Sequence, residues 1–212
     1  CSSDLHFMHT GLQALALELQ HASDCRCIYA DEIVHAGDGQ WGTLFRPDIN
    51  LDLLLSCPEG MARHWLYRRD VFLEAGGFDP DFAEAPEFDL ALRLIAADGI
   101  GAIGHVSEPL LTSALPRLAN HQHEIAAIER HLRSRGYVHA SVDASLPGRY
   151  RIHYGHEALP LVSIIIPTKD QFAMVERCVS SLLEKTTYQH YEIILVDNGS
   201  TDPSACAWIG GL

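Results

Sequence analysis

Two short polar runs near the end of the sequence have the residue types to bind a nucleotide. The first, Thr168-Lys169-Asp170, follows the apolar run 161–166, and the second, Asp197-Asn198-Gly199-Ser200, follows the apolar run 191–196. Continuous apolar runs of this length are typical of parallel strands buried on both faces. The intervening segment 172–185 has helical periodicity, so the three elements predict a βαβ unit.

The carboxyl ends of parallel strands meet at one edge of a sheet, and ligands bind there. Asp197, at the tip of the second strand, is placed to hold a ribose. A dinucleotide-binding fold would also need a glycine-rich turn after the first strand, and the turn 167–170 contains no glycine. We therefore predict that a nucleotide is held by its base and ribose. The alternative is that Asp197-Asn198-Gly199-Ser200 is merely a turn with no binding role. The predicted binding residues are Thr168, Asp170, Asp197, Asn198 and Ser200.

The composition excludes several classes of protein. The 212 residues are 47% hydrophobic, enough for one large or two small folded domains. The net charge is −13 and no basic cluster is visible, so a nucleic-acid partner is not expected. The longest apolar run, around 159–167, is too short for a transmembrane helix, and we read no secretory signal at the start.

The six cysteines are scattered without a CxxC motif, which favours a reduced, cytoplasmic protein. Cys25 and Cys27 lie two apart in a predicted strand, so we interpret them as small buried side chains that share one face. None of the 13 histidines has the spacing of a zinc site, and we expect them to be solvated or in the core.

Hydrophobic periodicity and turn residues also predict elements in the first 160 residues. An asparagine cap at Asn50 and a glycine stop at Gly99 help to delimit two of the helices. The expected helices are 12–20, 50–56, 69–75, 86–97 and 118–135, and the expected strands are 27–34, 64–67 and 100–106, with 148–154 as half of a hairpin.

Three stretches of the last quarter resemble the opening of a family 2 glycosyltransferase domain of the GT-A type. They are PLVSIIIPTKD at 160–170, ERCVSSLLEKTTY at 176–188 and YEIILVDNGSTD at 191–202. Earlier stretches resemble the back half of the same kind of domain, in the same order. These are IYADEI at 28–33, FRPDINLDLLLS at 45–56, WLYRRDVFLEAGGF at 65–78 and EFDLALRL at 87–94.

The resemblance implies an α/β fold of the GT-A (Rossmann-like) type, with a mixed sheet and helices on both faces. It implies that 1–117 is the acceptor-side, C-terminal half of one domain and that 160–212 is the nucleotide-binding, N-terminal start of a second. Residues 118–159 would be a helical and hairpin connector. We expect the chain to be a piece of a longer, tandem-domain bacterial protein, inactive as a transferase by itself. Its last two strands would either join the sheet of the first half or, as we expect, form a separate small unit.

The family's chemistry follows from the same resemblance. It implies sugar transfer, hexosyl in type, from a UDP- or dTDP-sugar to a glycan or lipid-linked acceptor in O-antigen-like or capsule synthesis. The reaction would be inverting, with a carboxylate as general base and Mn²⁺ or Mg²⁺ held by a DxD motif. The location would be cytoplasmic, peripheral to the inner membrane.

By position in the resemblance, Glu87 corresponds to the general base, although the family has the shorter Asp there. The alternative is a carboxylate favoured by a helix N-terminus. Asp31 and Glu32 are candidates for the acceptor pocket, with a solvated strand end as the alternative. Asp89 is a further acceptor-side candidate, although we first interpret it as a surface ion pair with Arg93, four residues on.

Two departures from the family pattern favour a second reading. Only Asp4 offers a carboxylate near the expected DxD position, so it is a weak metal candidate and the metal ligands are largely missing. The stretch 111–114 stands where the family often has YHWR, and Thr112 and Ala114 cannot bind a metal or a diphosphate. These departures support the alternative that the first half is a degenerate module, which binds a glycan acceptor or serves as a scaffold. A further alternative is a connector that docks two transferase domains.

Overall fold

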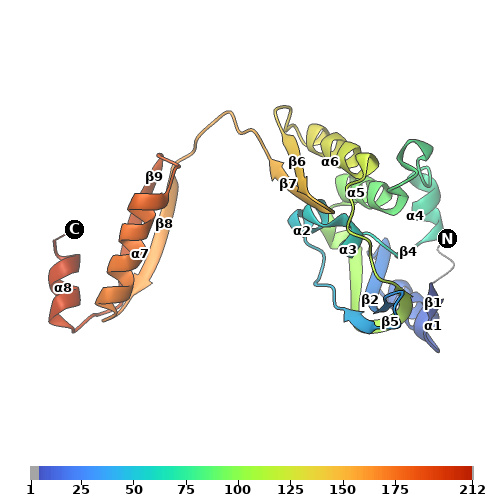
Figure 1. Cartoon of the computed structure of the whole chain (residues 1–212), viewed down its shortest axis with the longest axis horizontal. Coiled ribbons are helices and arrows are strands. Elements are labelled where there is room, and N and C mark those ends of the chain that lie inside the picture. Colours follow the sequence, from blue (N-terminus) through green and yellow to red (C-terminus); the bar gives the residue numbers. More distant parts are fainter. Residues whose placement is uncertain (1–4, 212) are drawn as a thin grey trace. The chain divides into compact units, whose positions relative to one another are not determined.

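The computed structural model describes residues 5–211 and divides into two compact units, with the boundary after His156 (Figure 1). The first unit contains a mixed sheet of five strands. Its order is β1-β5-β2-β3, and β4 also pairs with β2. The central pair, β2 and β5, is parallel, and the other pairs are antiparallel. The strands are β1 (His6–Phe7), β2 (Cys27–His35), β3 (Trp41–Leu44), β4 (Leu66–Tyr67) and β5 (Ile103–Ala114).

Helices cover both faces of this sheet, because successive side chains of a strand point to opposite faces. On one face, helix α1 (Gly11–His21) packs against Ile28 and Ala30 of β2. On the other face, Tyr29 of β2 belongs to the larger core, to which the remaining helices contribute. These are α2 (Leu51–Ser56), α3 (Pro58–Met61), α4 (Arg69–Glu74), α5 (Pro86–Asp98) and α6 (Gln122–Ser134), with the short 3-10 turn η1 (Pro80–Phe82). A second 3-10 turn, η2 (Ile100–Ala102), precedes β5 and has no buried residue. The fold is the expected α/β type with a mixed sheet.

The segment expected as a connector contains a helix and a hairpin, and both pack on the first unit. The hairpin consists of β6 (Ser141–Leu146) and β7 (Arg149–His153). Ile128 and Leu132 of α6 and Tyr150 of β7 are almost fully buried members of the larger core. Residues 118–156 therefore complete the hydrophobic core of this unit.

Four local predictions differ from the structure. The strand expected at 64–67 is only the two-residue β4, Leu66–Tyr67. The strand expected at 100–106 begins at Ile103 and continues to Ala114, because it pairs with β2 over its length and with β1 near its end. The helix expected from 118 begins at Gln122. The prediction that Cys25 and Cys27 share a face is wrong: Cys25 precedes β2 and lies in the core beneath α1, whereas Cys27 lies in the core on the other face. Both are nevertheless buried free thiols, as expected.

The second unit is the predicted βαβ element. Strands β8 (Val162–Thr168) and β9 (Tyr191–Asp197) are parallel, and they form a two-stranded sheet of their own. Helix α7 (Phe172–Lys185) connects them, and α8 (Pro203–Ile209) follows β9. The register ends with Thr168 opposite Asp197, so the two polar runs leave the sheet at the same edge.

No helix in the described range 5–211 is long and apolar enough to cross a membrane.

Candidate functional site

The carboxyl edge of the second unit brings together the residues predicted to bind a nucleotide. The backbone N–H of Asn198 donates to the carbonyl of Thr168 at 2.9 Å, which extends the strand pairing by one residue. The Ser200 hydroxyl lies between the two aspartates: it donates to Asp197 Oδ1 at 2.5 Å and accepts the Asp170 N–H at 2.9 Å. The run 197–200 is thus a turn, and it is also tied to the loop that follows β8.

The Asp170 side chain fixes the start of the segment that follows Ser200. Its Oδ1 accepts the backbone N–H groups of Thr201 and of Asp202, the latter at 2.8 Å. These backbone hydrogen bonds hold the pKa of the Asp170 carboxyl below its usual value, and the bond from Asp202 has the larger effect. Asp202 in turn caps α8 by accepting the Ala205 N–H at 2.8 Å. Sequence reasoning missed Thr201 and Asp202, although an Asp followed by Pro203 is a recognisable helix start.

In the first unit, a second cluster forms around two adjacent carboxylates of β2. Asp31 is 2% exposed and Glu32 is fully buried, so the alternative of a solvated strand end is wrong. The reason is that β2 lies inside the sheet, between β5 and β3. Strand β5 and the loops that carry Arg46 and His64 supply the partners of both carboxylates.

Glu32 is surrounded by donors from three segments. The Ser113 hydroxyl donates to Oε2 at 2.5 Å, His64 Nδ1 lies 3.2 Å from both carboxylate oxygens, and the Arg46 guanidinium forms an ion pair with Oε1. Arg63 Nε lies 3.5 Å from Oε2. Burial alone would raise the pKa of Glu32, but the hydrogen bond from His64, the charge of Arg46 and the Ser113 bond together lower the pKa below its usual value.

Arg46 and Arg63 bring positive charge to the end of β5. Arg46 donates from its backbone N–H to Asp31 Oδ1 at 2.8 Å, and from its guanidinium to the carbonyl of Arg63 at 2.9 Å. Arg63 Nη2 donates to the carbonyl of Ala114 at 3.0 Å. The two arginines therefore hold the loop before β4 against the stretch 111–114, and no sequence pattern assigned them this role.

Glu87 joins this cluster through His64. Glu87 lies in the first turn of α5, and its Oε2 accepts the backbone N–H of His64 at 2.8 Å. Within residues 5–211, no hydrogen bond to its Oε1 is present. Burial is the main cause that raises the pKa of Glu87 above its usual value, against the lowering effect of the His64 N–H. A half-buried carboxylate with one oxygen anchored and a raised pKa is suited to accept a proton.

Asp89 does not share this site. It is fully buried, and its carboxylate pairs with Arg93 Nε at 2.9 Å and with Arg130 of α6. The surface ion pair expected for Asp89 and Arg93 is therefore wrong: the pair lies at the interface of α5 and α6, and its second arginine comes from 41 residues along the chain.

His64 has a left-handed backbone, with φ of 57°, which is uncommon for a residue with a side chain. We expect His64→Val to destabilise the first unit by about 1–3 kcal/mol more than His64→Asn does, because a β-branched residue is strained in this conformation. Both variants lose the imidazole, so the comparison isolates the backbone. Chemical denaturation measures the difference, and equal stability of the two variants would contradict a strained His64.

The described residues do not fit a metal site. Among residues 5–211, no group of three His, Cys, Asp or Glu side chains is placed to hold a metal ion. The weak candidate Asp4 lies outside the described residues.

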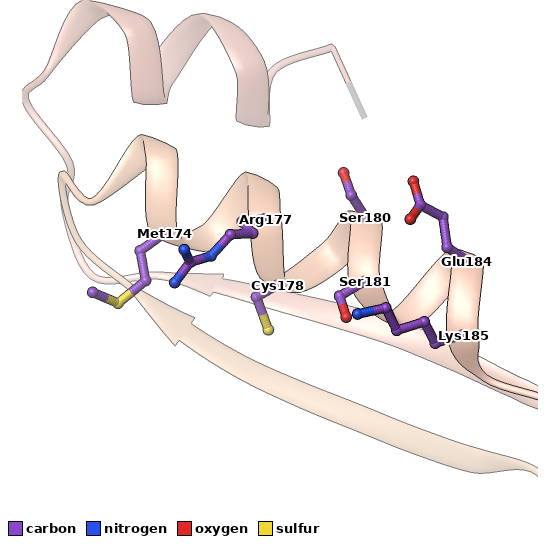
Figure 2. A pocket seen from close by; sticks show the side chains of 7 residues that line it. All are labelled: Met174, Arg177, Cys178, Ser180, Ser181, Glu184 and Lys185. Atoms are coloured by element: carbon purple, nitrogen blue, oxygen red, sulfur yellow. The ribbon is translucent and has the colours of Figure 1, made fainter.

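A separate pocket of about 590 Å³ lies along α7 and contains none of the predicted site residues. Figure 2 shows its lining side chains leaving α7 itself. They are Met174, Arg177, Cys178, Ser180, Ser181, Glu184 and Lys185.

Comparison with known proteins connects the second unit to a family. Residues 163–205 match the family model of "Glycosyl transferase family 2". This range contains the whole strand-tip cluster, from Thr168 to Asp202. The first unit is outside the match.

Two longer proteins resemble nearly the whole chain. The "O-antigen biosynthesis protein RfbC" of Myxococcus xanthus is 33% identical over 208 residues, which is 92% of this chain and 16% of that protein. The "Uncharacterized protein y4gI" of Sinorhizobium fredii is 32% identical over 200 residues, 88% of this chain and 22% of that protein. The chain thus spans less than a quarter of either relative. In these comparisons, the second unit is similar to the part of family 2 glycosyltransferases that the family model describes.

Proposed function

We propose that this protein transfers a sugar from a nucleotide-sugar donor to a glycan or lipid-linked acceptor during synthesis of a bacterial cell-surface polysaccharide of the O-antigen or capsule type. The observation that carries the proposal is the position of the family match, which coincides with the residues gathered at the carboxyl edge of β8 and β9. The name of the Myxococcus relative, an O-antigen biosynthesis protein, supports the same class of pathway. The reaction would take place in the cytoplasm, at the surface of the inner membrane.

The two clusters are proposed to serve two transferase domains. Residues 1–117 would be the acceptor-side half of one domain, with 118–156 folded onto it. Residues 160–212 would begin the nucleotide-binding half of another. A UDP- or dTDP-sugar would bind at the second cluster, where Asp197 and Asn198 would contact the nucleoside.

In the first cluster, Glu87 is proposed as the general base. An acceptor hydroxyl would transfer its proton to Glu87 Oε1 as its oxygen forms a bond to the anomeric carbon. The bond from that carbon to the nucleoside diphosphate breaks, and the diphosphate leaves with the electron pair. Attack from the face opposite the leaving group inverts the anomeric centre. Asp31 and Glu32 would shape the acceptor side indirectly, by fixing the loop that carries His64.

A specific observation favours a second candidate for the first unit. Thr112 and Ala114 replace side chains that the family uses, and the neighbouring Arg63 is engaged by the protein itself, at Ser113 and Ala114. Under this alternative, the first unit binds a glycan acceptor without turnover.

Calorimetric titration with UDP, dTDP and their sugars, with and without Mn²⁺, tests the nucleotide site. We expect one nucleotide to bind per chain, and Asp197→Ala to weaken binding at least about tenfold, because hydrogen bonds to a charged partner are lost. Glu176→Ala is the matched control, since it removes the same charge from an exposed position of α7. Failure of every nucleotide to bind, or equal binding by both variants, would count against this site.

A further inference from the structure

We propose that Asp170 is a positioning residue, which holds the loop 198–202 in the conformation that receives the nucleotide and does not itself contact it. The inference deepens the proposed nucleotide site and rests on it. It also assigns different tasks to the two aspartates, which sequence reasoning grouped together as ligands.

The hydrogen bonds of the Asp170 carboxylate carry the argument. Its Oδ1 accepts two backbone N–H groups, those of Thr201 and Asp202, and its Oδ2 lies 3.4 Å from the Thr201 hydroxyl. A carboxylate that already accepts backbone N–H groups on one oxygen and faces a hydroxyl on the other has little capacity left for a ribose. The same bonds lower its pKa, so the residue remains an acceptor throughout the neutral range.

The backbone of Asp170 contributes to the same task. Its φ of 55° is left-handed, a conformation that Asp tolerates better than most residues. In this conformation its N–H donates to the Ser200 hydroxyl at 2.9 Å. Asp170 thus contacts the loop after β9 through both its backbone and its side chain, across 30 residues of sequence.

Asp197 remains the better candidate for ligand contact. Its Oδ1 accepts the Ser200 hydroxyl at 2.5 Å and the Ser200 N–H at 3.1 Å. Its Oδ2 has only a long contact, 3.3 Å, with the same N–H. Among the described residues, Asp197 is thus contacted by two donors, both on Ser200, whereas Asp170 is contacted by three. Asp197 therefore has more acceptor capacity left for hydroxyl donors such as those of a ribose.

Conservative variants separate positioning from contact. Asparagine at position 170 keeps an oxygen that accepts both backbone N–H groups, whereas alanine removes it. We therefore expect Asp170→Asn to bind UDP within about threefold of wild type, and Asp170→Ala to bind about tenfold or more weakly, because it loses two hydrogen bonds that order the loop.

Amide hydrogen exchange of the nucleotide-free chain supplies a second, ligand-independent readout. We expect exchange at Thr201 and Asp202 to accelerate about tenfold or more in Asp170→Ala and to change little in Asp170→Asn. Asp197→Ala should weaken UDP binding while leaving these two amides nearly unchanged, since their acceptor is on Asp170.

Two results would overturn the inference. Unchanged exchange at Thr201 and Asp202 in Asp170→Ala would show that the carboxylate does not hold the loop. Equal loss of UDP affinity in Asp170→Asn and Asp170→Ala would show that its charge contacts the nucleotide. If wild type binds neither UDP nor dTDP, the proposed function fails, but the exchange measurement still decides whether Asp170 orders the loop.

Discussion

Replacing Glu32 with alanine is expected to destabilise the first unit by about 3–5 kcal/mol, because a buried cation loses its partner. The Arg46 side chain is 1% exposed, so without Glu32 its charge stays buried and uncompensated. Ser113 and His64 lose their acceptor at the same time. Chemical denaturation followed by circular dichroism measures the change in unfolding free energy.

Two controls distinguish the ion pair from a general effect of removing a glutamate. Glu108→Ala, at an exposed position of β5, should change stability by less than about 0.5 kcal/mol. The double variant Glu32→Met/Arg46→Met should lose less than the sum of the single variants, since no charge is left buried. Additive losses would contradict a coupled pair.

The same carboxylate makes stability depend on pH. The pKa of Glu32 is lower in the folded state than its usual value, 4.5. Its contribution is therefore fully present above pH 4.5, and it is lost as the pH falls through the lower folded-state pKa. Between pH 7 and pH 3, wild type should lose more stability than Glu32→Gln, and parallel pH profiles would contradict the assignment.

A chain cut after residue 117 is expected not to fold cooperatively, whereas 1–156 should. Helix α6 and the hairpin β6–β7 bury Ile128, Leu132 and Tyr150 in the larger core, where α5 packs against α6. Without them, α5 would lose the helix that packs against it. Thermal unfolding monitored by near-ultraviolet circular dichroism should show a sharp transition for 1–156 only.

A point variant tests the same packing without truncation. Ile128→Ala should cost about 2–5 kcal/mol, since Ile128 is fully buried and its removal leaves a cavity. Gln122→Ala, at an exposed position in the first turn of α6, is the matched control and should be nearly neutral. A cooperative transition in 1–117, or a neutral Ile128→Ala, would mean that residues 118–156 are only a linker.

Local sequence patterns were sufficient to predict many of the helices and strands. Helix α7 has the bounds that its periodicity predicts, and the strands of the βαβ unit differ from the prediction by one or two residues at their ends. The Asn50 cap is present, with its side chain accepting the Leu53 N–H. In each case, the residues that determine the helix or strand lie close together in the sequence.

The sequence alone therefore determined the α/β class, the βαβ unit and the meeting of Thr168 with Asp197, because strand direction and side-chain periodicity are local properties. Only the tertiary structure decided the environment of the acidic residues. Asp31 and Glu32 are buried because β3 and β5 flank their strand, and Asp89 because α6 covers α5. Their partners, Arg46, Ser113 and Arg130, lie 14 to 81 residues away along the chain. Charge neutralisation over such separations depends on which segments pack together, and periodicity within a single element carries no information about that packing.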